Sequence, residues 1–119
     1  AVPVPECDSD TLAPLIDWIA ENLREDLTVD VLAARVSMSP RTFARRFQAE
    51  TGTTPARWIS DQRVLEAQRL LESTDLSVEA VADSVGFGSA AVLRQHFLRL
   101  RRTTPQSYRR TFRAAPVSV

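Results

Sequence analysis

Apolar residues along the chain recur at the three- and four-residue spacing of amphipathic helices. The stretch 39–52, SPRTFARRFQAETG, shows this clearly, because Phe43 and Phe47 fall on one face of a helix. Ser39 can cap the first turn, the proline after it suits the first helical position, and Gly52 supplies a left-handed stop. The pattern predicts a helix of about thirteen residues whose aromatic face points inward.

The opposite face of the same stretch carries groups that can recognise bases. It presents guanidinium, methyl and amide groups at i, i+3, i+4 and i+7, from Arg41, Ala44, Arg45 and Gln48. Such groups read guanine, the thymine methyl and adenine in a DNA major groove. Taken alone, the stretch also fits a surface helix with a solvated basic face.

Two further helices are expected before this one. Leucines and isoleucines at helical spacing follow Asp10, a candidate N-cap, and Trp18 adds bulk to their apolar side. A shorter helix within 27–37 is capped by Thr28. It is too short to be stable alone, so its apolar side must dock on the aromatic face of 39–52. The tight turn between them predicts helix-turn-helix geometry.

A longer helix should follow from Thr54, again a cap before a proline, to about Glu72. Its apolar stripe consists of Trp58, Ile59, Ala67, Leu70 and Leu71. We interpret Trp58, like the earlier tryptophan, as a core anchor.

The second half of the chain repeats the first. Residues 76–87 match 27–38 at a shift of 49, and after an extra residue at Gly88 the shift becomes 50. Gly86 stands where a left-handed residue would end the short helix, whereas its counterpart Ser37 would spend about 1 kcal/mol in that conformation. A repeat in this register favours two helix-turn-helix units over a single solvated helix.

The repeat also defines the outer faces of the last two helices. On the counterpart of 39–52, the outward positions are Ala91, Arg94, Gln95 and Leu98, with Ala90 at the exposed N-terminal end and His96 at the boundary. A final helix over 105–112 should carry Tyr108 inward and Arg109 and Arg110 outward.

Charge is distributed in blocks although the formal net charge is zero. Residues 1–30 carry eight acids and one arginine, and 31–63 carry six arginines and two acids. Residues 64–83 carry one arginine and five acids, and 84–119 carry seven arginines and no acid. Two basic blocks separated by an acidic stretch are typical of a surface that binds a polyanion.

Composition limits the alternatives. A chain of 119 residues with 44% hydrophobic content is one compact domain or two very small ones. Its single cysteine, Cys7, excludes an internal disulfide, and with one histidine it excludes a zinc site of four soft ligands. Residues 1–9 hold two prolines and indicate a linker, and the lack of a signal or membrane segment predicts a cytoplasmic protein.

The doubled helix-turn-helix, the stretch 75–87 (DLSVEAVADSVGF) and the stretch 97–110 (FLRLRRTTPQSYRR) resemble the DNA-binding domain of the AraC/XylS family of bacterial transcription regulators. The resemblance implies an all-α domain of seven helices, with one recognition helix in each of two successive major grooves of double-stranded DNA. It implies no cofactor and no metal. The domains expected are a first unit at 10–53, a linker helix at 54–73, a second unit at 74–113 and a tail at 114–119.

Carried over by position, the family's base contacts fall on Arg41, Ala44 and Arg45 in the first recognition helix and on Ala90, Ala91, Arg94 and Gln95 in the second. Better-known members have larger groups where alanines stand here, so the second unit either reads bases or mainly grips phosphate. The full set of expected DNA-binding residues is Arg41, Ala44, Arg45, Gln48, Ala90, Ala91, Arg94, Gln95, Arg109 and Arg110.

The resemblance also implies partners. Family members carry a separate sensing or dimerisation domain, and the wording SMSPRTFARRF and GFGSAA is most similar to the subgroup whose N-terminal domain resembles class I glutamine amidotransferases of the PfpI/ThiJ type. RNA polymerase is a further expected partner.

Two other function classes fit the sequence less well. A helical protein-interaction module would need apolar anchors in place of Arg41, Arg45 and Arg94. An enzyme would need a nucleophile elbow, a phosphate loop, a metal cluster or paired carboxylates, and the sequence has none of these motifs.

Overall fold

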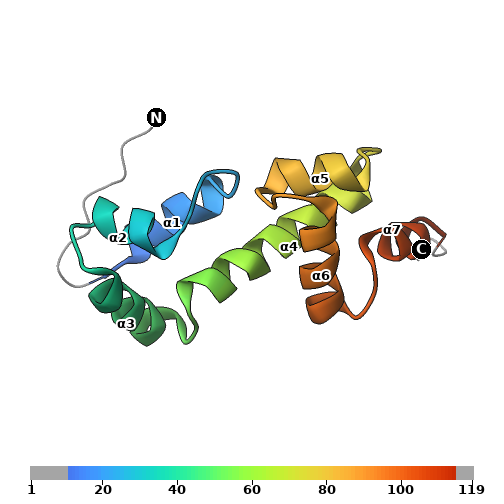
Figure 1. Ribbon diagram of the computed structural model, residues 1–119. Coiled ribbons are helices and arrows are strands. Elements are labelled where there is room, and N and C mark those ends of the chain that lie inside the picture. Colours follow the sequence, from blue (N-terminus) through green and yellow to red (C-terminus); the bar gives the residue numbers. More distant parts are fainter. Residues whose placement is uncertain (1–10, 115–119) are drawn as a thin grey trace. The chain divides into compact units, whose positions relative to one another are not determined.

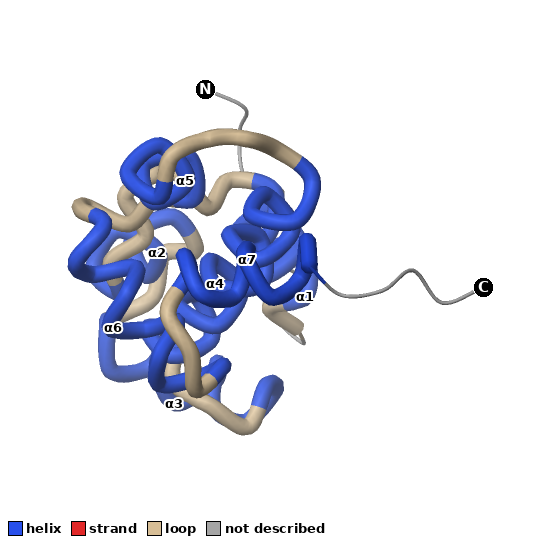
Figure 2. Tube along the Cα trace, turned by 90° about the vertical axis from the view of Figure 1, so that its right-hand side faces the viewer, coloured by secondary structure: helices blue, strands red, loops and turns tan. Residues whose placement is uncertain are grey.

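The computed structural model describes residues 11–114, and all regular secondary structure in this range is helical (Figures 1 and 2). The prediction of an all-α fold with seven helices is confirmed. None of the described helices is both long and apolar enough to cross a membrane. The helices are α1 (Ala13–Glu21), α2 (Val29–Arg35), α3 (Pro40–Thr51), α4 (Pro55–Ser73), α5 (Val78–Val85), α6 (Ala90–Arg101) and α7 (Pro105–Ala114).

The described residues divide into two compact units, one ending at Ser60 and the other beginning at Asp61. Helix α4 therefore contributes its first residues to one unit and the remainder to the other. Each unit has its own cluster of buried apolar side chains. The linker at 1–9 and Cys7 lie outside the described residues.

The first unit is a helix-turn-helix in which α2 packs against α3. Its core centres on Phe43 and Phe47, both fully buried, whose rings lie 5.8 Å apart. Trp58 is half-buried and meets Phe47 edge-on at 6.0 Å, while Trp18 is buried. Both tryptophans thus anchor the core, as predicted.

The caps expected from the sequence are present in this unit. Thr28 accepts a hydrogen bond from the Val31 amide, and Ser39 accepts one from the Thr42 amide. Gly52 ends α3 in the left-handed region with φ of 81°. These bonds satisfy amides and carbonyls that a helix end leaves without partners.

The start of α1 differs from the prediction. Asp10 lies outside the described residues, and α1 begins at Ala13 with Leu12 at the N-cap position. The carboxylate of Glu50, near the end of α3, accepts hydrogen bonds from the Leu12 amide at 2.8 and 2.9 Å and from the Thr11 hydroxyl at 2.8 Å. A carboxylate from a distant part of the chain therefore caps α1 and fastens it to α3.

The second unit repeats this plan with α5 packed against α6 and α6 against α7. Ser77 caps α5 and Ser89 caps α6. Phe97 is fully buried, and the Tyr108 ring meets it edge-on at 5.6 Å. The Tyr108 hydroxyl also donates a hydrogen bond to Glu72 of α4, so the inward position predicted for Tyr108 is confirmed.

The turns before the two recognition helices share one conformation. Gly86 has φ of 94° and Ser37 has φ of 56°, so both residues are left-handed. In each turn the next amide bonds back to a helix carbonyl, Met38 to Ala33 at 2.9 Å and Phe87 to Ala82 at 3.0 Å. The first unit builds with serine a turn that favours glycine.

We expect Ser37→Gly to raise the free energy of unfolding of the first unit by about 0.5 to 1 kcal/mol, because glycine removes the Cβ crowding of the left-handed conformation. The greater conformational freedom of glycine in the unfolded chain offsets part of this gain in stability. Urea denaturation followed by tryptophan fluorescence would measure it, since both tryptophans lie in this unit. The reciprocal change Gly86→Ser should destabilise the second unit. A lower urea midpoint for Ser37→Gly would show that the left-handed conformation of Ser37 is not strained.

Candidate nucleic-acid interface

Helix α3 presents an exposed face opposite its buried phenylalanines. Arg41, Arg45 and Gln48 are exposed and Ala44 is half-buried. No carboxylate within residues 11–114 pairs with Arg41 or Arg45. All the donors of these two guanidinium groups remain available to an acceptor outside the chain.

Helix α6 presents the equivalent face of the second unit, with Ala91, Arg94, Gln95 and Leu98 all exposed. Arg94 lies 3.7 Å from a carboxylate oxygen of Glu79 on α5, and both side chains are exposed. Such a surface ion pair contributes little free energy, so Arg94 can exchange this carboxylate for another anion.

The prediction that Ala90 is exposed is wrong. Its side chain is only 9% exposed and belongs to the core cluster that includes Phe87 and Leu93. Phe87, which fills the turn before α6, is itself buried and lies in the same cluster. The methyl group of Ala90 is therefore used in packing and is not presented to a ligand.

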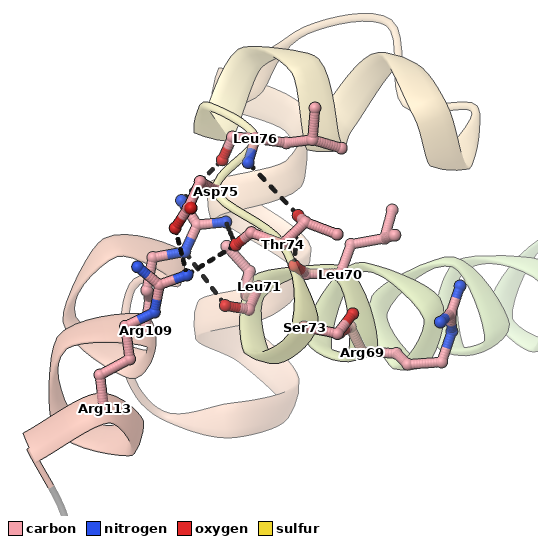
Figure 3. A network of polar contacts seen from close by, with 9 residues as sticks. All are labelled: Arg69, Leu70, Leu71, Ser73, Thr74, Asp75, Leu76, Arg109 and Arg113. Carbon is pink, nitrogen blue, oxygen red and sulfur yellow. Dashed lines mark hydrogen bonds and ion pairs between the residues drawn. The ribbon is translucent and has the colours of Figure 1, made fainter.

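The prediction that Arg109 points outward is also wrong. Its guanidinium group is directed at backbone carbonyls in the last turn of α4 and just beyond it, as Figure 3 shows. Nε donates to the Leu71 oxygen at 3.1 Å, Nη1 to that of Leu76 at 2.6 Å, and Nη2 to that of Thr74 at 3.1 Å. The last carbonyls of a helix lack intrahelical partners, and Arg109 supplies donors for this region. It is half-buried and structural.

Arg113 adds to the same network. It donates to the Thr74 carbonyl at 2.7 Å and forms an ion pair with Asp75 at 2.8 Å (Figure 3). Arg110 lies on a different side of α7 and is exposed, with no hydrogen-bond or ion-pair partner among the described residues. Of the two predicted phosphate contacts on α7, only Arg110 is free to make one.

His96 is a boundary residue, as predicted. Its ring stacks on Phe87 with centroids 5.2 Å apart, and Nδ1 accepts a hydrogen bond from Arg99 at 3.1 Å. Burial lowers the pKa of His96, and the charge of Arg99 lowers it further. Both effects favour the neutral imidazole over its charged form.

Sequence reasoning missed the carboxylates that hold the arginines of α6. Glu79 pairs with Arg94, and Asp61 of α4 lies 3.9 Å from Arg99. Only the helix-turn-helix register could have indicated the first pair, because it places α5 beside α6. The second pair joins residues far apart in sequence and has no local signal.

Comparison with known proteins places this geometry in a family. The family model described as "Helix-turn-helix domain" matches residues 32–111. The HTH-type transcriptional regulator Rv1931c of Mycobacterium tuberculosis is 42% identical over 81 residues, which are 68% of this chain and 31% of that protein. The HTH-type transcriptional activator RhaS of Salmonella schwarzengrund is 32% identical over 105 residues, 88% of this chain and 34% of that one. The chain thus spans about a third of the length of these curated relatives.

Solved structures share the fold. The DNA-binding domain of AdpA, crystallised in complex with a target DNA, is 50% identical, with a TM-score of 0.85 over 89% of this chain and 96% of that one. An AraC-type regulator from Chromobacterium violaceum is 27% identical, with a TM-score of 0.76 over 89% and 94% of the two chains. Because the family model matches well over half of the sequence, the chain belongs to the AraC-type helix-turn-helix domains of transcription regulators.

Proposed function

We propose that this chain binds double-stranded DNA sequence-specifically, as the DNA-binding domain of a bacterial transcription regulator. The observation that carries the proposal is the unpartnered pair Arg41 and Arg45 on the exposed face of α3, opposite the phenylalanines that fix the helix. Arginine donors held on a rigid helix suit the O6 and N7 acceptors of guanine. The complex of the related AdpA domain with a target DNA supports the same reading.

Each proposed contact follows from the chemistry of the side chain. On α3, Arg41 and Arg45 read guanine, Gln48 reads adenine and Ala44 lies against a base edge or methyl group. On α6, Ala91, Arg94 and Gln95 face the bases of the second groove. Arg110 of α7 contacts phosphate. Ala90 and Arg109 are removed from the set because the core and the end of α4 occupy their side chains.

The rest of the regulator is part of the proposal. The part of this chain that aligns covers only about a third of its curated relatives, so we propose that the regulator has a further sensing or dimerisation domain. The resemblance of the segments SMSPRTFARRF and GFGSAA leads us to propose an N-terminal domain of the PfpI/ThiJ type. The whole protein would act in the cytoplasm, where bacterial DNA lies, with RNA polymerase as a partner.

Neither alternative class is favoured. A protein-interaction helix would place apolar anchors where Arg41, Arg45 and Arg94 stand. The matching family model and the relatives named above are those of transcription regulators, whose helix-turn-helix domains are not enzymes.

Arg45→Ala is expected to relax sequence preference. Loss of a bidentate contact to guanine should cost about 1 to 3 kcal/mol at one base position, so the matched site loses affinity while a site mismatched there does not. A duplex selected from a random pool and its single-mismatch variants would be titrated with both proteins at two salt concentrations.

Arg110→Ala is the matched control, since it also removes one exposed arginine. It should weaken all duplexes alike and lower the slope of affinity against salt by about one. An Arg45→Ala protein that weakened matched and mismatched duplexes equally would show that Arg45 does not read a base.

A further inference from the structure

The outer face of α6 has a centre and two edges. With about 100° between successive residues of a helix, Gln95 lies opposite the buried Leu93 and Phe97, with Ala91 and Leu98 within about 60° of it on one side and Arg99 within about 40° on the other. Arg94 lies farther toward one edge. The middle of the face therefore carries an amide, a methyl and an isobutyl group beside the Arg99 guanidinium.

Both arginines of this face have partners inside the unit. Arg94 lies 3.7 Å from Glu79, and Arg99 lies 3.9 Å from Asp61 and 3.1 Å from the His96 ring. In α3 the repeat positions of Ala91 and Gln95 hold Arg41 and Arg45, and neither arginine pairs with a carboxylate among the described residues, so the two faces differ in chemistry although they share a register.

Leu98 is the residue that distinguishes the second face. It is 52% exposed and stands at the repeat position of Gln48 in α3. A single exposed leucine is ordinary on a protein surface, so its exposure alone has no meaning. Around the helix axis, however, Leu98 lies between Arg94 and Gln95, on the face that carries the proposed DNA contacts. This position indicates that Leu98 also faces the DNA.

Only one apolar group lies on the base edges of the major groove, and it is the C5-methyl group of thymine. Side chains such as alanine and leucine can cover that methyl group, and glutamine can bond the N6 and N7 atoms of adenine. We infer that the face of α6 selects A·T pairs, with Leu98 and Ala91 covering thymine methyl groups and Gln95 bonding adenine, whereas Arg41 and Arg45 of α3 select G·C pairs. This inference rests on the proposed DNA binding and makes the second unit a reader of bases in addition to its grip on phosphate.

Deoxyuridine, which lacks the methyl group of thymine, is the probe. The whole 119-residue chain would be titrated with the selected duplex and with versions in which each thymine in turn is replaced by deoxyuridine. At one or two thymines in the half-site of the second unit, affinity should fall about fourfold, as expected for one methyl group returned to water. Apart from a thymine that faces Ala44 in the first half-site, thymines elsewhere in the duplex should be insensitive.

Two variants assign the effect to Leu98. Leu98→Ala keeps a good helix former at an exposed position, so the fold should persist while the sensitivity to deoxyuridine disappears. Leu98→Gln copies the first unit and should move the preference at that position from a thymine methyl toward adenine.

Three outcomes decide the question. If no thymine of the second half-site is sensitive while the chain still discriminates among duplexes, the inference fails and the proposed function stands. Sensitivity that persists in Leu98→Ala would also overturn the role of this residue. A chain that bound all duplexes equally would overturn the proposed function itself.

Discussion

Arg109→Ala is expected to lower the free energy of unfolding of the second unit by about 3 kcal/mol. The guanidinium group makes three hydrogen bonds to carbonyl oxygens, those of Leu71, Thr74 and Leu76. A hydrogen bond from a charged donor contributes about 1.5 to 3 kcal/mol, and the three are not independent because one side chain makes them all. Removing them takes the guanidinium donor from the Leu71 and Leu76 carbonyls and leaves the Thr74 carbonyl with Arg113 alone.

Amide hydrogen exchange would measure this loss, because it reports the opening of α5, α6 and α7 separately from the rest of the chain. Protection should fall in these helices, while the tryptophan fluorescence of the first unit keeps its urea midpoint. Arg110→Ala is the matched control, since Arg110 is the next residue on the same helix and has no partner within residues 11–114. It should leave exchange unchanged.

Arg109→Lys separates charge from geometry. Lysine keeps the positive charge, but its compact ammonium group cannot span three carbonyl oxygens as the guanidinium fork does. It should recover only part of the lost stability. Full stability in either Arg109 variant would mean that Arg113, which also donates to Thr74, is sufficient to hold this region.

Structural features that depend on local chemistry could be predicted from the sequence. Ser39 and Gly52 bound α3 as predicted, and Gly86 ends α5 in the left-handed region. Each of these features depends on a residue and its near neighbours, and the second unit repeats the serine cap with Ser89. The exposed positions Arg41, Arg45 and Gln48 followed from helical periodicity for the same reason.

Errors arose where a distant part of the chain decides the environment of a side chain. The sequence does hold a signal that Arg109 is partly buried. In the internal repeat with a shift of 50, Arg109 corresponds to Ile59, which is only 3% exposed. An arginine at the register of a core residue needs internal acceptors, and the end of α4 provides them. The burial of Ala90 depends on Phe87, and the cap that Glu50 gives to α1 joins residues 38 positions apart, so periodicity indicates neither.

The proposed reading of two successive major grooves rests on one continuous helix. Helix α4 contributes residues to both units. Its 19 residues give it a length of about 28 Å. One turn of the duplex is about 34 Å, so we propose that α4 acts as a stiff spacer and that a single chain covers two patches about ten base pairs apart. This spacing remains a prediction.

Inserting about five base pairs between the two patches is expected to reduce specific affinity roughly a hundredfold. Half a helical turn moves the second patch to the far side of the duplex, and losing base contacts worth about 3 kcal/mol gives a factor of that size. Footprinting and titration on the natural and lengthened sites would measure it. A variant with glycines inserted between Ser60 and Asp61 is the control, because a flexible joint in α4 should recover the lengthened site. Equal affinity of the unaltered chain for both sites would mean that its units are flexibly joined or that only the first reads DNA.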